Sequence, residues 1–421
     1  MQLPEEFVQQ TRRVMGEQRF DRFLASFDDD PPVSIRLNPK KVGSDSPSPL
    51  MTEVHLGGKD TIPWCPLGFY LPERPNFTFD PLLHAGCYYV QEAASMFIHH
   101  ILGEYVKEEQ CGPLAVLDLC AAPGGKSTCS ISALPEGSQL WANEPVRQRA
   151  SILLENITKW GYPGCTVTNN YPHDYVRSGL TFDIVLCDVP CSGEGMFRRD
   201  PQTISEWSPQ QVEKCWRLQR DIVNDAWQCL RPGGLLIYST CTFNTKENEE
   251  NVRWIFETFD ADILPVDTRP EWNITGSLLA GFDAPVYRFI PGITRSEGLF
   301  VAVMKKRSLN ATPSLREEGG RKAPKRKNRE NGLGLNILVP VSIGQENEGE
   351  AYPLDYPTAI AFLRGEAIRL PDDAPRGQLL VSFMGHSLGV VKNIGSRANN
   401  LYPKEWRIKS THVPQDYSPV I

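Results

Sequence analysis

The chain has 421 residues, which is longer than one typical domain and enough for two or three. Its composition, 40% hydrophobic and 23% charged, is ordinary for a globular protein. It lacks any run of about 18 apolar residues, so we expect no transmembrane helix. The first residues include acidic side chains and no apolar stretch, so we expect no secretory signal. The net charge of −7 argues against a general nucleic-acid binder.

Cysteine usage points to a reducing compartment. All eleven cysteines lie between Cys65 and Cys241, without CxxC pairs or His/Cys clusters of metal-ligand spacing. Such a distribution is not that of a disulfide framework. We therefore expect a cytoplasmic protein with reduced cysteines and no bound metal, and we expect it to be a monomer.

The N-terminal part predicts a mixed α/β module over residues 1–85. Helical periodicity extends from Glu5 to Phe27, and SIRLNP at 34–39 predicts a strand that ends at proline. The stretch 63–80 is rich in proline and aromatic residues, and we expect it to be irregular. A helical pattern follows from Val90 to Tyr105.

The middle of the chain alternates between predicted strands and helices. We expect strands at 114–120, 139–144, around Thr166, at 182–190, 233–242 and 298–306, and helices at 126–134, 145–160 and 209–229. This alternation predicts an α/β fold over residues 86–307, with an open, mostly parallel sheet between two layers of helices.

Two further segments follow this domain. Residues 308–334 show little periodicity and predict a linker. The stretch from Lys305 to Glu330 carries ten Lys or Arg against three acidic residues. It is either a solvated connection or an electrostatic arm that contacts phosphates. Residues 335–421 contain short apolar runs, which predict a small β-rich domain.

A glycine-containing turn follows the first strand of the α/β domain. Its sequence is AAPGGKS, residues 121–127, and the next strand ends at Glu144. Small residues let a ligand approach the backbone, and the following helix directs its N-terminal amides to the same place. Glu144 is placed to accept both hydroxyls of a ribose. The phosphate-loop alternative fails because Cys120 stands where that pattern requires glycine. The turn alone is also compatible with a plain strand-to-helix corner.

Two cysteines occur where later strands of the same sheet end. DVPC brings Asp188 and Cys191 to the end of one strand, and STCT brings Cys241 to the end of the next. Such cysteines are commonly buried small hydrophobes, but two beside an acid at a ligand-binding edge favour a reactive site. A thiolate that adds to carbon 6 of a pyrimidine makes carbon 5 nucleophilic toward a methyl donor. A base must then remove the C5 proton.

The sequence resembles the Sun-type (Fmu-like) family of RNA cytosine-5 methyltransferases. The resemblance rests on DLCAAPGGKS, DVPCSGEGMFRRDP and PGGLLIYSTCTFNTKENE, with support from SIRLNP, YYVQEAASM and SEGLFVAVMKK, and spans residues 30–307. The C-terminal GVVKNIGSRANNLYPKEWRI is similar to the PUA-like RNA-binding domain of bacterial 16S ribosomal RNA members. The resemblance implies a Rossmann-like methyltransferase domain that uses S-adenosyl-L-methionine on RNA, either 16S rRNA or the small ribosomal subunit.

The resemblance also implies roles for individual residues. Cys241 corresponds to the nucleophile, Cys191 to the cysteine that assists product release, and Asp188 to the acid of the proline-cysteine motif. The residues implied in cofactor binding are Cys120, Ala121, Ala122, Pro123, Gly124, Gly125, Lys126, Glu144, Asp174 and Asp188. In DVPC a valine replaces the small residue of the family, and Asp174 lies in a loop whose length varies among relatives.

Alternatives remain open at this point. In DNA cytosine methyltransferases the proline-cysteine thiol is the nucleophile, which would exchange the roles of Cys191 and Cys241. A non-catalytic assembly factor on the same scaffold would be expected to lack Cys241 or the glycine-rich turn. The motifs do not exclude transfer RNA as the substrate. Lys392, Arg397, Lys404 and Arg407 are candidate phosphate contacts, and Tyr402 and Trp406 either stack on bases or pack internally.

Overall fold

The fold is that of a computed structural model of the 421-residue chain. It describes residues 3–42, 60–107, 112–307, 333–339, 351–410, 412–414 and 420–421. The predicted basic linker lies outside the described residues, except for Leu333 and Gly334. Contacts divide the chain into two compact units. The first is Met1–Pro32, Glu92–Leu153 and Pro163–Leu338, and the second is Val33–Gln91, Leu154–Tyr162 and Val339–Ile421.

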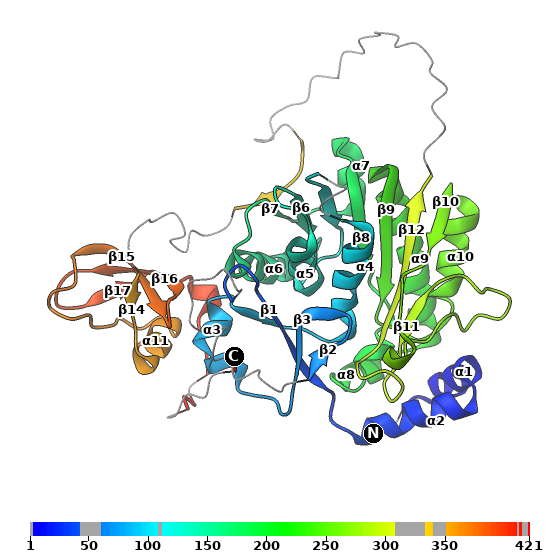
Figure 1. Ribbon diagram of the computed structural model, residues 1–421, viewed down its shortest axis with the longest axis horizontal. Coiled ribbons are helices and arrows are strands. Elements are labelled where there is room, and N and C mark those ends of the chain that lie inside the picture. The colour runs from blue at the N-terminus through cyan, green and yellow to red at the C-terminus, as the bar shows by residue number, and fades with distance from the viewer. Residues whose placement is uncertain are drawn as a thin grey trace, which may run out of the picture. The chain divides into compact units, whose positions relative to one another are not determined.

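The first unit is built on one nine-stranded sheet, drawn in Figure 1. The strand order is β10-β12-β9-β8-β5-β6-β7-β13, and β11 pairs with β12. The strands are β5 (Ala115–Asp118), β6 (Gln139–Asn143), β7 (Cys165–Thr168), β8 (Phe182–Asp188), β9 (Leu230–Thr240), β10 (Ala261–Leu264), β11 (Tyr287–Phe289), β12 (Leu299–Lys306) and β13 (Ile337–Leu338). Pairings among β5 to β9 are parallel, and the outer pairings are antiparallel. The predicted α/β, Rossmann-like fold is confirmed.

Helices bury both faces of the central strands. They are α4 (Phe97–Tyr105), α5 (Gly125–Ala133), α6 (Arg147–Trp160), α7 (Pro172–Ser178), α8 (Gln202–Glu206), α9 (Pro209–Cys229) and α10 (Glu249–Thr258). Leu117 and Val185 share one apolar cluster with Ile222 of α9, while Val116 and Ile184, which alternate with them, are equally buried. Near-continuous apolar strands are expected where both faces of a parallel sheet are covered.

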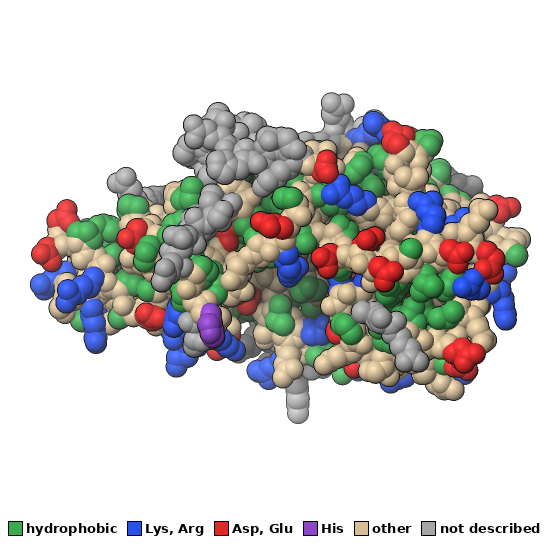
Figure 2. Space-filling model, turned by 90° about the horizontal axis from the view of Figure 1, so that it is seen from below, with side chains coloured by type: hydrophobic (Ala, Val, Ile, Leu, Met, Phe, Trp, Pro, Cys, Tyr) green, Lys and Arg blue, Asp and Glu red, His purple; other side chains and the backbone are tan. Residues whose placement is uncertain are grey.

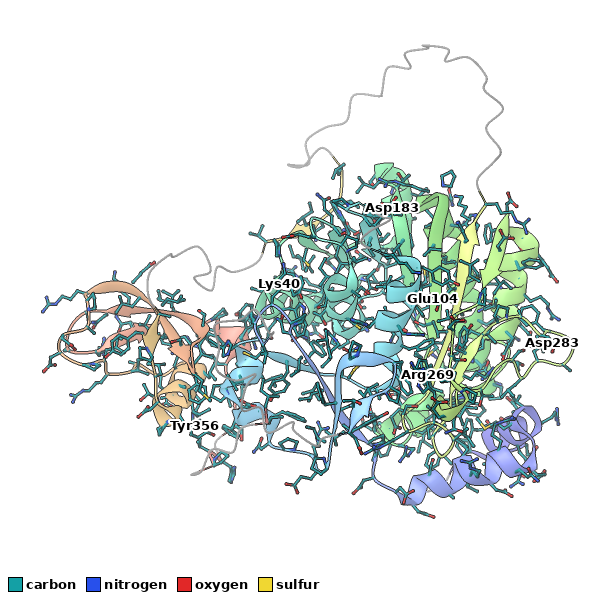
Figure 3. All side chains as sticks on the ribbon, in the orientation of Figure 1. Lys40, Glu104, Asp183, Arg269, Asp283 and Tyr356 are labelled. Atoms are coloured by element: carbon teal, nitrogen blue, oxygen red, sulfur yellow. The ribbon has the colours of Figure 1, made fainter. Side chains whose placement is uncertain are left out.

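The order of the strands creates a switch point between β5 and β8. From β5 the chain passes through α5 to β6 on one side, whereas β8 pairs on the other side. Ligands of open α/β sheets bind beyond the carboxyl ends of the strands at such a point. Asp188 ends β8 at this edge. Asp183, labelled in Figure 3, lies near the start of β8 and accepts a hydrogen bond from Ala115 N at the opposite edge.

Two N-terminal helices belong to the first unit, although sequence periodicity predicted one helix over 5–27. They are α1 (Glu5–Met15) and α2 (Glu17–Ala25). Gly16, whose φ is 75°, interrupts the helical conformation between them. That prediction was wrong in this detail, since glycine readily adopts positive φ while the apolar spacing stays helical on both sides. Phe7 packs edge-on against Phe197 with ring centroids 5.0 Å apart, and Phe23 packs against Phe243 at 5.0 Å.

The second unit contains two four-stranded sheets. The first has the order β2-β3-β1-β4, with β1 (Val33–Leu37), β2 (Thr61–Ile62), β3 (Cys65–Leu71) and β4 (Tyr88–Val90). The expectation of irregular chain over 63–80 was wrong for β3 (Cys65–Leu71), which pairs with β1, whereas residues 72–80 form no strand and only a short 3-10 turn at Phe77–Phe79. The aromatic residues of β3 suit a pleated surface, and this outweighs the proline near its start.

The C-terminal residues form the predicted small β-rich domain. Its elements are β14 (Tyr352–Pro353), α11 (Tyr356–Leu363), β15 (Gly377–Phe383), β16 (His386–Asn393) and β17 (Ala398–Asn400), in the sheet order β14-β15-β16-β17. The β15–β16 hairpin turns at Met384 and Gly385, both with positive φ, as tight hairpin turns require. Tyr356, labelled in Figure 3, donates a hydrogen bond to Phe79 O at 3.2 Å.

Buried polar bonds tie the end of α6 to the segment before β4. The Asn38 side chain donates to Gly86 O at 2.9 Å and to Trp160 O at 2.8 Å. Lys41 donates to both Ala85 O and Lys159 O. The backbone at Gly86 passes so close to α6 that a β-carbon there would lie 1.9 Å from Lys159 O. Only glycine fits this crossing, because φ at Gly86 is also +73°.

Substitution of Gly86 by alanine tests this close approach. We expect Gly86→Ala to lower the free energy of unfolding by more than about 3 kcal/mol, through strain at positive φ and a clash with backbone. Gly179 is the matched control, since its φ is +74° and nothing lies within 4 Å of a β-carbon built there. Gly179→Ala should cost only about 1 kcal/mol. Equal losses for the two variants in urea unfolding would contradict the packing described here.

Candidate active site

The glycine-rich turn connects β5 to α5 at the carboxyl edge of the sheet. Gly124 has a φ of 114° and stands directly before the first residue of α5. Ala121 N donates to Asn143 O at 2.8 Å, and Arg149 Nη2 donates to Ala122 O at 2.9 Å. Burial raises the pKa of the Cys120 thiol well above its ordinary value, so this thiol stays neutral. The turn is thus fixed from both sides and directs the amides of α5 to the switch point.

Asp118, the last residue of β5, anchors the turn from behind. It is fully buried, and its Oδ2 accepts a hydrogen bond of 2.6 Å from Ser127 Oγ in the first turn of α5. Burial raises the pKa of Asp118 to about 7. Sequence analysis did not single this residue out, because an acid that ends an apolar strand has no spacing pattern of its own.

Glu144 follows β6 and is 1% exposed. Its Oε1 accepts a hydrogen bond from Val146 N at 2.9 Å. Its Oε2 lies 3.1 Å from Arg149 Nη1, close enough for an ion pair, yet without a donor aligned for a hydrogen bond. This poorly aligned contact leaves most of the bonding capacity of Oε2 unused. A buried carboxylate oxygen with spare capacity suits a ligand hydroxyl.

Asp174 lies in the first turn of α7, and its bonds are local. Its Oδ2 accepts from Tyr171 N at 3.1 Å, and its Oδ1 lies 3.9 Å from Arg177 Nη1. The carboxylate therefore caps its own helix. Its assignment to the cofactor site stays a prediction. Unlike Glu144 and Lys126, Asp174 makes no contact within the described part of the chain that connects it to the glycine-rich turn or to the switch point.

Asp188 joins the glycine-rich turn to the end of β9. Lys126 Nζ lies 2.9 Å from its Oδ2, and Ser239 Oγ donates to its Oδ1 at 2.8 Å. Burial disfavours the charge of Lys126, but the neighbouring Asp188 outweighs burial and raises the pKa of Lys126. The pair therefore places a cation and an acid side by side at the switch point.

The two cysteines of the strand-end motifs meet in the structure. β8 and β9 are neighbours, and Cys191 Sγ lies 3.2 Å from Cys241 Sγ. Both residues are half-buried. The hydrogen bond to Cys241, with burial, raises the pKa of Cys191 well above its ordinary value. Cys191 thus keeps its proton, and its thiol lies within hydrogen-bonding distance of the Cys241 sulfur.

Glu194 locks the loop of Cys191 to the loop of Cys241. It is 2% exposed and accepts four hydrogen bonds, from Phe243 N, Asn244 N, Asn244 Nδ2 and Trp207 Nε1, at 2.7–3.0 Å. Gly195 N also donates to Cys241 O at 2.9 Å. A carboxylate that accepts this many bonds holds both loops in one conformation.

Glu247 makes a second connection between the same loops. It is fully buried, and its side chain accepts from Ser192 N at 3.0 Å, Gln219 Nε2 at 2.6 Å and Asn244 Nδ2 at 2.8 Å. Burial raises the pKa of Glu247 to about 7. Sequence analysis missed both glutamates. The only sequence feature that could have indicated their role was their position inside the DVPCSGEG and TKENE motifs. In sequence alone, glutamates at such positions look like ordinary surface residues.

The C-terminal candidates for RNA contact belong to the second unit and divide into two groups. Tyr402 and Trp406 are buried, with ring centroids 6.0 Å apart, so the two rings pack against each other within the small β domain. Lys392, Arg397 and Lys404 are exposed, while Arg407 is half-buried and its Nη2 donates to Tyr402 O at 3.3 Å. Figure 2 shows Lys and Arg side chains gathered at the left of the view, over the small β domain.

The described residues contain neither a candidate membrane-spanning helix nor a candidate metal-binding cluster. No helix among them is long and apolar enough to cross a membrane. No group of three or more His, Cys, Asp or Glu side chains among them is arranged to hold a metal ion. The expectation that the protein binds no metal stays a prediction.

Comparison with known families identifies the class of protein. Residues 106–305 match the family described as 16S rRNA methyltransferase RsmB/F. Residues 3–93 match the N-terminal domain of 16S rRNA methyltransferase RsmF, and residues 350–408 match the methyltransferase RsmF PUA domain. The sheet, the glycine-rich turn and the paired cysteines therefore belong to a methyltransferase, and the small β domain is its RNA-binding PUA domain.

Similarity to individual proteins extends along the whole chain. The ribosomal RNA small subunit methyltransferase F of Escherichia coli (strain K12) is 30% identical, with 96% of each chain covered. The enzyme of the same name from Shigella boydii serotype 4 is also 30% identical, again with 96% of both chains covered. The chain belongs to the RsmB/F family of 16S rRNA methyltransferases.

Solved structures support the fold. A methyltransferase homolog protein from Pyrococcus horikoshii is similar with a TM-score of 0.61 at 24% identity, over 72% of this chain and 95% of that one. NSun6 from Pyrococcus horikoshii, solved with SFG, gives a TM-score of 0.58 at 20% identity, over 72% of this chain and 98% of that one.

The role of Glu194 leads to a stability prediction. In Glu194→Gln an amide NH2 replaces one carboxylate oxygen and faces donors, so we expect a loss of about 2–3 kcal/mol in the free energy of unfolding. Glu206→Gln is the control, because Glu206 is exposed in the same segment. The control should leave the urea midpoint unchanged. If Glu194→Gln unfolded at the wild-type midpoint, the loops would not depend on this carboxylate.

Proposed function

We propose that the protein transfers a methyl group from S-adenosylmethionine to carbon 5 of a cytosine in 16S ribosomal RNA. The reaction proceeds through a covalent bond between Cys241 Sγ and carbon 6 of that base. The observation that carries this proposal is the 3.2 Å approach of Cys191 Sγ and Cys241 Sγ beside Asp188, at the switch point of a methyltransferase sheet. Family membership supports RNA as the substrate.

The residues around the glycine-rich turn fit S-adenosylmethionine. The turn and the N-terminus of α5 expose backbone at the switch point, and Glu144 has a buried oxygen with spare bonding capacity. The proposed binding residues are Cys120, Ala121, Ala122, Pro123, Gly124, Gly125, Lys126, Glu144, Asp174 and Asp188. The similar fold of NSun6 was solved with SFG, an analogue of S-adenosylmethionine. When bound, the cofactor supplies an electrophilic methyl group.

The reaction follows from the chemistry of the paired thiols. The Cys241 thiolate adds to carbon 6, and the electron pair of the C5–C6 double bond moves toward carbon 5 and the ring. Protonation of ring nitrogen 3, or a hydrogen bond to it, stabilises the adduct, and we assign this task to Asp188, which Lys126 and Ser239 hold in place. After methylation a base removes the C5 proton, the C6–S bond breaks, and the thiolate returns to Cys241. Cys191, next to that bond, assists this elimination.

Family membership also supports a proposal for how the protein binds RNA and where it acts. We propose that residues 335–421, the PUA-domain region, contribute much of the affinity for RNA through exposed cations such as Lys392, Arg397 and Lys404. The substrate is free 16S rRNA or the small ribosomal subunit, and the protein acts as a monomer in the cytoplasm without a metal.

Removal of each cysteine tests the mechanism. In Cys241→Ala the nucleophile is absent, so neither methylated product nor covalent adduct should form. In Cys191→Ala the nucleophile remains but elimination slows, so a protein–RNA thioether should accumulate after methyl transfer and survive denaturing electrophoresis. The gel is run on each full-length variant with 16S rRNA and S-adenosylmethionine.

A third cysteine provides the control for thiol loss. Cys129 is buried in α5, outside the two cysteine loops, and Cys129→Ala should methylate RNA like wild type. A covalent band from Cys241→Ala but none from Cys191→Ala would overturn the assignment and indicate exchanged roles. Full methylation by both site variants would show that neither thiol reacts.

Glu144 offers a separate test of the cofactor site. We expect Glu144→Ala to weaken S-adenosylmethionine binding by about 1–3 kcal/mol, because charge-assisted hydrogen bonds to hydroxyls are lost. Glu136→Ala, at an exposed position after α5, should bind like wild type. Calorimetric titration measures both affinities, and thermal unfolding confirms that the variants are folded. If Glu144→Ala bound S-adenosylmethionine with unchanged affinity, Glu144 would not be part of the cofactor site.

A further inference from the structure

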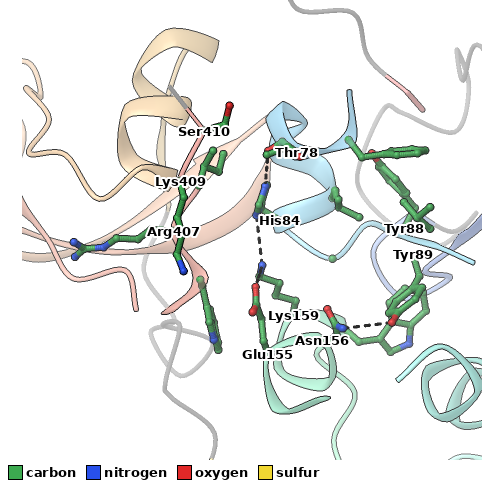
Figure 4. Close-up of a pocket in the computed structure, with 17 residues that line it drawn as sticks. Thr78, His84, Tyr88, Tyr89, Glu155, Asn156, Lys159, Arg407, Lys409 and Ser410 are labelled. Atoms are coloured by element: carbon green, nitrogen blue, oxygen red, sulfur yellow. Dashed lines mark hydrogen bonds and ion pairs between the residues drawn. The ribbon is translucent and has the colours of Figure 1, made fainter. Parts of the chain in front are cut away.

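The second unit contains a cavity of about 600 Å³ that the reaction does not use. Its wall comes from three places in the chain, shown in Figure 4: the segment from Phe77 to Val90, the last turns of α6, and the segment from Trp406 to Ser410. Sites for small organic molecules and cofactors have volumes of about 300–1,000 Å³. The cavity is therefore large enough for a nucleotide.

Aromatic rings form much of this wall. Phe77, Tyr88, Tyr89, Trp160 and Trp406 all line the cavity. Tyr89 and Trp160 meet edge to face with centroids 6.4 Å apart, and Asn156 Nδ2 donates to the Tyr89 hydroxyl at 3.3 Å. Ring faces held in fixed orientations are what bases stack on in single-stranded RNA sites.

Cationic and neutral polar side chains also line the cavity. Lys159, 8% exposed, pairs with Glu155 Oε1 at 2.5 Å, and Figure 4 shows its ammonium directed at His84. The His84 Nε2–H donates to Thr78 O, so Nδ1 accepts from Lys159 Nζ at 3.4 Å. Burial and Lys159 lower the pKa of His84 to about 3, so the ring is neutral. Lys409, by contrast, is exposed at the cavity.

We propose that this cavity binds an unstacked nucleotide of the substrate RNA, other than the cytosine that is methylated. The base packs against the aromatic wall at Tyr89, the half-buried ring among five of which the other four are buried. Its edge meets polar groups such as Asn156 and Ser410, and Lys409 binds its phosphate. The proposal rests on the proposed function, because that function makes RNA the ligand. Part of the wall lies in the matched RNA-binding PUA domain. No residue assigned to the methyl-transfer site lines the cavity.

Two substitutions at exposed positions of the cavity wall test the proposal without disturbing the core. Ser410→Trp fills the cavity, and Lys409→Glu places a negative charge beside the phosphate. Arg369→Glu is the control, because Arg369 is exposed in the same small β domain but does not line the cavity. The probe is transcribed 16S rRNA containing 4-thiouridine, bound to full-length protein near physiological salt.

We expect Ser410→Trp and Lys409→Glu to weaken RNA binding about tenfold, the size of one lost stacking or phosphate contact, with Arg369→Glu within about twofold of wild type. Photo-crosslinks should map to peptides containing residues 77–90 or 406–410 and disappear in Ser410→Trp. All variants should bind S-adenosylmethionine like wild type, which separates the cavity from the methyl-transfer site and from misfolding.

Several results would overturn the proposal. If the wild-type protein methylates RNA and both cavity variants bind RNA with normal affinity, the cavity takes no part in RNA recognition. The proposed function would then still stand. If Arg369→Glu weakened RNA binding as much as the cavity variants do, the effect would be a general one of surface charge and not of the cavity. Competition by free cytidine or adenosine monophosphate at micromolar concentration would make this a site for free nucleotides. Wild-type protein that methylates no RNA would remove the proposed function itself.

Discussion

Two buried carboxylates, Glu194 and Glu247, hold together the two loops on which the proposed chemistry depends. Glu194 and Glu247 accept hydrogen bonds from both the loop after β8 and the loop after β9, and between these loops the Cys191 and Cys241 sulfurs lie 3.2 Å apart. Unpaired, such carboxylates would be costly to bury, but with all their acceptors used they rigidify their surroundings. Thiol-based catalysis requires that rigidity, because small displacements of a nucleophile reduce reaction rates steeply.

The parallel sheet supplies the other half of the arrangement. Its order places the carboxyl ends of β5 and β8 at one switch point, so that the glycine-rich turn and Asp188 face the same crevice. The Lys126–Asp188 pair then connects the proposed cofactor turn to the strand that carries Cys191. Backbone topology thus brings the proposed cofactor turn and the two thiols to one edge of the sheet, and side-chain bonds refine their positions.

Much of this could be predicted from sequence, because the signals were local. Apolar runs gave the central strands, and the positions of Cys191 and Cys241 after two of them predicted a shared edge. What escaped prediction depended on burial or on contacts between distant segments. Glu194, Glu247 and Asp118 look like surface acids until the fold encloses them, Gly16 breaks a helix whose periodicity continues on both sides, and β3 is specified by its pairing with β1.

We propose that the loops of Cys191 and Cys241 methylate carbon 5 of a cytosine in 16S rRNA. The most direct measurement is bisulfite sequencing of 16S rRNA from cells that carry the Cys241→Ala chain in place of the native one. We expect at least one 5-methylcytosine that is present in wild-type cells to be lost, and to return when the native chain is supplied. An unchanged pattern of 5-methylcytosine in 16S rRNA would contradict it.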